Sequence, residues 1–251
     1  NKETLWTVKT ASLTPDNPIT MSWDNGQGLY FIREISLDNN YGFKVSQYVI
    51  NNSAKDIKLF PFALINQRGL PEDFLGRWIV HEGPIGYIDD QLLDPSYKKL
   101  KKEPKTELKS KTGWIGFVEK DWLVALIPKQ DEDITYRINH SSSPIKGIKD
   151  TYQVDSLGQE RVIKPSEKAI FETHAFVGAK KLDLLVGYEK KWTVPHFDLA
   201  VDFGMFYFLT RPFFAVINFF YGYVGNFGIA IILFTIVLRI CVFPLANTSF
   251  R

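Results

Sequence analysis

The chain has 251 residues, a formal net charge of +2, 45% hydrophobic and 23% charged residues, and one cysteine. This balance is ordinary for a globular protein, the small charge argues against a nucleic-acid partner, and a single cysteine excludes a disulfide within the chain. Residues 1–195 carry nearly all the charge, whereas residues 197–246 are almost uncharged and rich in Phe, Ile and Leu. We therefore expect a water-soluble domain followed by a membrane-associated tail. Because the sequence starts at Asn1 without a leader pattern, we expect a piece of a longer protein.

Residues 27–67 show the alternation of apolar side chains that is typical of β-strands. In "GLYFIREISLD", Leu29, Phe31 and Ile35 share one face. The turn segments "NNYG" and "NNSAKD" separate this run from "FKVSQYVI" and "IKLFPFALINQ". The pattern predicts a three-run antiparallel meander, in which Pro61 marks an edge strand or a bulge.

Strand patterns resume further along the chain. "GWIGFVEKDWLVALIP" (residues 113–128) predicts a hairpin with "EKD" as its turn, and "ITYRI", "DTYQVD" and "KAIFETHAFVGA" predict further strands. Short strands at this spacing indicate a large antiparallel sandwich. Residues 179–191 differ, because Leu182, Leu185 and Val186 recur at helical spacing, so we expect a short helix that closes the domain.

Residues 98–111, "KKLKKEPKTELKSK", contain seven lysines. A basic segment of this kind could bind anionic lipid head groups, each lysine contributing roughly 1 kcal/mol. A solvated loop, or an edge strand whose charges discourage aggregation, explains the same pattern. We favour the second interpretation.

No pattern of catalytic or metal-binding residues emerges. The four histidines, at positions 81, 140, 174 and 196, show no metal-ligand spacing, and no phosphate-binding loop, dinucleotide fingerprint, zinc-protease motif or nucleophile elbow is present. We expect no catalytic residue, no metal and no cofactor, and hence no enzymatic activity. A large sandwich can still bind a sugar in a cleft, as mutarotase-like domains do, but no residue marks such a cleft.

Residues 196–225 form a predicted linker and a helix that lies in the membrane interface. Ten of the residues from Phe203 to Tyr223 are Phe or Tyr, a density that suits the head-group level of a bilayer. Arg211 and Pro212 near the middle make a spanning helix the weaker alternative. The phenylalanines expected to enter the interface are Phe206, Phe213, Phe214, Phe219 and Phe220.

Residues 226–251 contain the predicted transmembrane helix. Phe227 to Ala246 is a run with one charge, Arg239, and 20 residues at 1.5 Å each span about 30 Å, one hydrocarbon thickness. A central Arg costs roughly 3 kcal/mol, which about a dozen apolar residues offset by roughly 6. The guanidinium could reach the interface along its flexible stem, or it could face a water-filled cavity in a helix bundle. We favour the cavity.

The tail resembles one known family. "VDFGMFYFLTRPFFAVINFFYGYVGNFGIAIILFTIVLRICVFPLANTSF" is similar to the region around the first core helix of the bacterial YidC proteins, members of the YidC/Oxa/Alb membrane insertases. The shared features are the "DFG" start, the aromatic helix, "VGNFG", an apolar run with one arginine, and "PL" before polar residues. "GWIGFVEKDWLVALIP" and "FVGAKKLDLL" also resemble the large periplasmic domain of Gram-negative members.

This resemblance implies a structure and a function. The soluble part would be a periplasmic β-supersandwich of the galactose mutarotase-like type, in a protein of the bacterial inner membrane. Arg239 matches the arginine of a hydrophilic intramembrane groove, through which nascent membrane proteins enter the bilayer, alone or beside the Sec translocon. The anchor helix and four further core helices of the family are absent from this sequence, so we expect that it cannot insert proteins by itself. The alternative hypothesis is a membrane-anchored carbohydrate-binding or carbohydrate-modifying β-sandwich.

Overall fold

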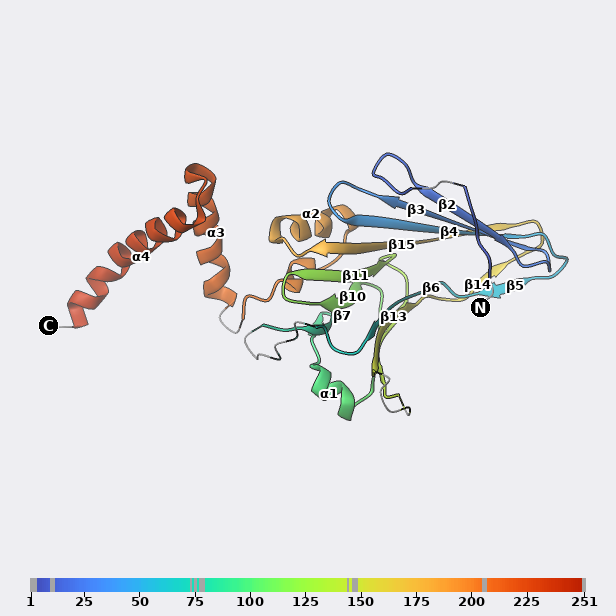
Figure 1. Cartoon of the computed structure of the whole chain (residues 1–251), viewed down its shortest axis with the longest axis horizontal. Coiled ribbons are helices and arrows are strands. Elements are labelled where there is room, and N and C mark those ends of the chain that lie inside the picture. Colours follow the sequence, from blue (N-terminus) through green and yellow to red (C-terminus); the bar gives the residue numbers. More distant parts are fainter. Residues whose placement is uncertain are drawn as a thin grey trace. The chain divides into compact units, whose positions relative to one another are not determined.

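The computed structural model describes residues 4–9, 12–72, 74, 76, 80–143, 145, 149–204 and 207–249. The chain divides into two compact units, Asn1–Val201 and Asp202–Arg251. The first unit consists of antiparallel sheets with a few short helices, and the second consists of two helices (Figure 1). The prediction of a mainly β, antiparallel fold is thus confirmed.

The larger sheet of the described chain has nine strands in the order β1, β2, β3, β4, β15, β11, β10, β7 and β8. Strands β1 to β4 follow one another in both the sequence and the sheet, whereas β15 lies between β4 and β11 and joins segments that are distant in sequence (Figure 1). The bounds are β1 Thr7–Val8, β2 Ile19–Asp24, β3 Leu29–Leu37, β4 Gly42–Asn51, β7 Gly83–Ile88, β8 Gln91–Leu93, β10 Gly113–Val118, β11 Trp122–Pro128 and β15 Lys168–Ala179.

Two smaller sheets complete the strand inventory of the described residues. The four-stranded sheet has the order β6, β13, β12 and β9, and β14 pairs with β5 in a two-stranded sheet. Their bounds are β5 Ile57–Leu59, β6 Phe62–Arg68, β9 Lys105–Ser110, β12 Ile134–Ser141, β13 Thr151–Leu157 and β14 Arg161–Ile163. The helices of this unit are α1 Tyr97–Lys102, α2 Leu182–Trp192 and the short 3-10 helix η1 Phe197–Ala200.

The predicted three-run meander is confirmed for its first two strands and wrong for the third. Strands β3 and β4 pair as expected, with Phe31 opposite Val49. The third run breaks at Phe60–Pro61 into β5 and β6, and these two strands join different sheets. Proline has no main-chain N–H to donate to a ladder, so the strand ends there. The expectation of an edge strand is confirmed, because β6 lies at the edge of the four-stranded sheet.

The other strand predictions are confirmed. β10 and β11 form the hairpin, with the amide of Glu119 donating to the carbonyl of Trp122 across the turn. The three later runs correspond to β12, β13 and β15. Five short strands were not predicted, namely β1, β2, β7, β8 and β14, because segments of two to six residues give too few alternations to detect.

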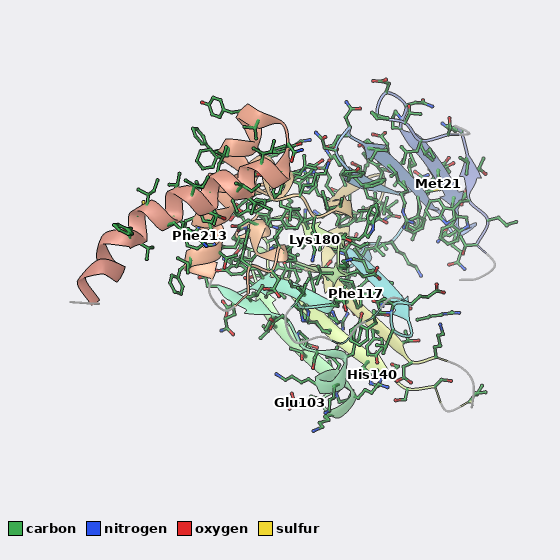
Figure 2. The ribbon with its side chains drawn as sticks, turned by 60° about the vertical axis from the view of Figure 1, so that its left-hand side comes forward. Met21, Glu103, Phe117, His140, Lys180 and Phe213 are labelled. Atoms are coloured by element: carbon green, nitrogen blue, oxygen red, sulfur yellow. The ribbon has the colours of Figure 1, made fainter. Side chains whose placement is uncertain are left out.

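Both faces of the nine-stranded sheet are covered over its central strands. One face packs against α2 and η1, where Trp114, Phe176, Leu185 and Phe197 are completely buried. The opposite face packs against the four-stranded sheet, and Phe117, which Figure 2 labels, belongs to this second cluster. Burying one such large side chain contributes about 1.5–3 kcal/mol, so the two clusters form the principal core of the domain.

Helix α2 closes the domain as predicted. Leu185 faces the core at 0% exposure, and His174 of β15 stacks on Trp192 with ring centroids 5.0 Å apart. The turn that follows β3 also holds the helix, because the hydroxyl of Tyr188 donates to Asp38 Oδ1 at 2.7 Å. Helix and sheet are therefore joined by both apolar and polar contacts.

The lysine-rich segment forms α1 and β9 rather than a loop. Tyr97 and Leu100 of α1 are buried, whereas the lysines of α1 are exposed. β9 is the other edge of the four-stranded sheet, with Lys105 and Lys109 on its exposed face. The interpretation as a charged edge strand is thus confirmed for residues 105–110.

Candidate functional site

The predicted site lies in the second unit, whose two helices are joined by a two-residue link. α3 spans Tyr207–Val224 and α4 spans Phe227–Ser249. Gly225 has a φ of 65°, and its amide donates to the carbonyl of Tyr221 at 2.8 Å, which is the usual way for a glycine to end a helix. Asn226 then caps α4, because its Oδ1 accepts from the amides of Gly228 and Ile229 at 2.9 and 3.3 Å. The dipeptide Gly-Asn thus fixes the point where the chain turns.

Aromatic side chains line the contact between the two helices. The rings of Phe213 and Phe234 lie 5.0 Å apart, and those of Tyr221 and Phe227 lie 5.4 Å apart. Figure 2 labels Phe213 on α3. Pairs at this separation contribute about 0.5–1.5 kcal/mol beyond simple burial, so they hold the hairpin of helices together.

The phenylalanines predicted to enter the membrane interface differ in exposure. Phe219 is 60% exposed, and Phe214 and Phe220 are half-buried, as is Phe213. Phe206 lies outside the described residues. No contact tests the predicted membrane role of these rings, which stays a prediction.

Arg239 is exposed on α4, four residues after Thr235, so the two side chains share one side of the helix. The hydroxyl of Thr235 donates to the carbonyl of Ile231 at 2.8 Å. No hydrogen bond or ion pair joins the Arg239 guanidinium to any residue that the structure describes. Its neighbours are apolar and exposed, such as Ile236 at 50% and Ile240 at 67%. A guanidinium in such surroundings needs water or an external anion.

Two further results bear on the site. Within the part of the chain that the structure describes, no helix combines the length and the apolar character that a membrane crossing requires. The same residues contain no group of three or more His, Cys, Asp or Glu side chains that could hold a metal ion. The predicted groove around Arg239 is not evident among the residues that the structure describes.

The sequence did not reveal a cleft in the first unit. The cleft has a volume of about 300 Å³, and Phe62, Glu132, Arg161 and Phe171 are among the residues that line it. These residues come from separate strands and loops, so no motif or spacing in the sequence connects them. Only the pairing of distant strands brings them together.

The described residues form an antiparallel β-sandwich domain followed by a pair of apolar helices. The chain is therefore in the class of two-part proteins with a β-sandwich domain and a helical tail. Within that class it belongs to the YidC family, because the family model described as "YidC periplasmic domain" matches residues 1–216. The chain is thus part of a membrane protein with a periplasmic domain, as the resemblance predicted.

Curated relatives agree with this assignment. The membrane protein insertases YidC of Rickettsia akari and Rickettsia prowazekii are each 40% identical over 252 aligned residues, which is all of this chain. The chain spans 44% of the length of these relatives. Insertases make and break no covalent bonds, so the prediction that the chain is not an enzyme is confirmed at the level of the family.

Solved structures show weaker likeness. A galactose mutarotase-like protein from Lactobacillus casei gives a TM-score of 0.46 at 10% identity, covering 68% of this chain and 72% of that one. An α-galactosidase from Lactobacillus brevis gives 0.46 at 8% identity, covering 72% of this chain and 27% of the other. Neither likeness is close enough to carry an argument, so the galactose mutarotase-like form of the sandwich stays a prediction.

Proposed function

We propose that the chain is the periplasmic domain and the first core helix of an insertase in the bacterial inner membrane. The complete protein inserts nascent membrane proteins and helps them to fold, alone or with subunits of the Sec translocon. Membership of the YidC family supports this function. So do the relatives named as membrane protein insertases, because their similarity extends over the whole of this chain. The same membership favours it over a membrane-anchored carbohydrate-binding sandwich.

The proposed membrane placement rests on the sequence and not on the described helices, among which no membrane-spanning helix is found. Residues 1–195 lie in the periplasm, residues 196–225 lead into the interface, and residues 226–251 cross the bilayer. The run Phe227–Ala246 has one charge, and its length of about 30 Å matches the hydrocarbon core. The phenylalanines of α3 would then insert at head-group depth, where aromatic rings are favoured.

Arg239 is the residue proposed to act on substrates. The observation that carries this proposal is its exposed guanidinium, which has no partner among the described residues of an otherwise apolar helix. In a hydrated groove, that charge would attract the carboxylates and polar main chain of an entering segment. The hydrophilic end of the substrate could then travel part of the way before its release into lipid, which divides one large desolvation barrier into smaller ones.

A reconstituted insertion assay tests this role of Arg239. The complete insertase is needed, because this chain spans 44% of its relatives. We expect Arg239→Ala to slow insertion of a substrate with a short acidic tail about tenfold, the effect of losing roughly 1.4 kcal/mol. Arg239→Lys should retain most of the rate, because it keeps the charge.

A matched substrate serves as the control. When the tail carboxylates are replaced by amides, the wild type and Arg239→Ala should insert the substrate at similar rates. If Arg239→Ala handles the acidic-tailed substrate at the wild-type rate, the guanidinium does not supply the attraction.

A further inference from the structure

The cleft of the first unit lies where strand β11 of the large sheet ends before its neighbour β15. Strand β15 pairs with β4 from Lys168 onward, but β11 pairs with β15 only up to Thr173, where Pro128 ends the ladder. The cleft opens at this step and reaches across to the start of β6 at Phe62. Its volume of about 300 Å³ is at the small end of the range for binding pockets, roughly 300–1,000 Å³.

Residues 168–172 of β15 therefore form an open strand edge. Among the described residues they have a partner strand on one side only, which is β4. The amide of Val177 donates to the carbonyl of Tyr41, and the amide of Asn51 donates to that of Glu167. These bonds show that the main-chain groups of odd-numbered residues in this region point toward β4.

Antiparallel ladders alternate, so the even-numbered residues of β15 direct their N–H and C=O groups the other way. The bond from the amide of Lys180 to the carbonyl of Asp121, on the β11 side, agrees with this alternation. Beyond the end of β11, the groups of Ile170 and Glu172 accordingly face the cleft. The N–H and C=O groups of Ile170 and of Glu172 are two residues apart, which is the spacing at which another extended chain presents its own N–H and C=O groups.

The side chains around this edge are apolar or already neutralised. Ile170 is 49% exposed and Phe62 is 43% exposed, so both present apolar surface beside the open edge. Glu132 accepts from Lys129 Nζ at 2.7 Å and from Arg161 Nη2 at 2.6 Å. The charges of the cleft thus largely satisfy one another, and the open main-chain groups and the apolar surface remain for a ligand.

We propose that this cleft binds an extended, apolar segment of another polypeptide by strand addition to residues 168–172. The segment continues the sheet where β11 stops. Its alternate side chains pack beside Ile170 on one face and toward Phe62 and Phe171 on the other. The main chain supplies the affinity and the apolar contacts supply the preference, as in other cases of strand addition. A sugar would leave the regular row of strand donors and acceptors unmatched.

This inference goes beyond the insertase function, because it uses neither Arg239 nor the helices α3 and α4. It assigns to the periplasmic domain a surface for polypeptide segments that have not yet formed a sheet of their own.

Fluorescence anisotropy with a synthetic peptide tests the proposal on the full chain. The probe is a capped, fluorescein-labelled nonapeptide of alternating valine and threonine. A second probe has the same side chains but N-methyl groups on alternate residues, which remove the donors that would face β15. We expect the N-methylated probe to bind at least about tenfold more weakly, because it loses two or more main-chain hydrogen bonds.

Two exposed positions of the same strand provide matched variants. Ile170→Lys places a charge at the open edge and should weaken binding about tenfold. Val177→Lys changes a side chain of similar exposure, 44%, at a position where β15 is paired on both sides, and should bind the probe like the wild type. Thermal unfolding of both variants checks that they fold equally well.

Three results would overturn the proposal. One is equal binding of the two probes, which would show that the main chain is not involved. Another is equal binding by Ile170→Lys and Val177→Lys, which would place the peptide elsewhere. The third is an absence of peptide binding together with saturable binding of galactose or glucose, which would make the cleft a carbohydrate site.

Discussion

The carboxylate of Asp38 shows how one side chain joins helix α2 to the sheet. Lys191 Nζ donates to its Oδ2 at 2.8 Å, and the amides of Asn40 and Gly42 each donate to its Oδ1 at 2.9 Å, together with the hydroxyl of Tyr188. Burial raises the pKa of Asp38, but these hydrogen bonds outweigh it and hold the pKa at about 2. An unfolded Asp titrates near 3.9. The ionised carboxylate therefore stabilises the folded state.

This contribution to stability depends on pH in a defined direction. Because the folded pKa is depressed, the stabilisation is fully present above about pH 4 and is lost as the pH falls toward 2. We expect Asp38→Asn to lower the free energy of unfolding by about 1–2 kcal/mol at pH 7, after allowance for solvent screening. Urea unfolding between pH 7 and pH 2.5 should show the difference from the wild type shrinking with acidity.

The exposed carboxylate of Asp183, in the first turn of α2, is the control. Asp183→Asn should change the free energy of unfolding by less than about 0.5 kcal/mol. A pH-independent deficit in Asp38→Asn would mean that the residue acts through packing rather than through its charge.

At the scale of elements, the link between α3 and α4 offers a comparison of two glycines. Gly225 has a φ of 65°, a conformation that costs other residues energy, whereas Gly222 lies within α3 and has open space around an added Cβ. We expect Gly225→Ala to destabilise the turn by about 1 kcal/mol. Gly222→Ala should stabilise α3 by about 0.5–1 kcal/mol.

Hydrogen exchange of the full chain in detergent can measure both effects. The amide of Ala230, which donates to the carbonyl of Asn226 at 3.0 Å, reports on the first turn of α4. It should exchange severalfold faster in Gly225→Ala. Equal protection in the wild type and in Gly225→Ala would show that the left-handed glycine is not needed to end α3.

The elements that the sequence predicted well are those whose signal is local. The hairpin of β10 and β11 has two apolar runs separated by a charged turn, and α2 has three apolar residues at helical spacing. The run containing Pro61 failed because its two halves pair with β14 and β13, about 100 residues further along the chain. Alternation shows that a strand exists, but it does not identify its partner.

At the scale of the whole molecule, the same limit explains what was missed about function. Arg239 stood out in the sequence as a candidate site residue because one charge interrupts a contiguous apolar run, and its role stays a prediction. The cleft beside β15 depends on where β11 stops relative to β15, and that register is set by residues spread over the whole first unit. Its open edge has no sequence signature.

The proposed membrane topology makes a prediction for the complete protein in cells. Cys241 is first replaced by serine, and Lys105, an exposed lysine of β9, by cysteine. A thiol reagent that cannot cross the inner membrane should label position 105 once the outer membrane is permeabilised, because residues 1–195 are proposed to lie in the periplasm. Labelling that requires lysis of the inner membrane would reverse the proposed orientation.

The hydration of position 239 is the most direct test of the account, because the proposed insertion step needs this side chain to face water within the bilayer. In the complete insertase lacking Cys241, single cysteines replace Arg239 or the adjacent, 67% exposed Ile240. The rate of modification by a maleimide is then compared, since the reagent attacks the thiolate that forms in water. We predict rapid modification at position 239 and little at position 240. Equal, negligible modification at both positions would contradict the proposed hydrated groove.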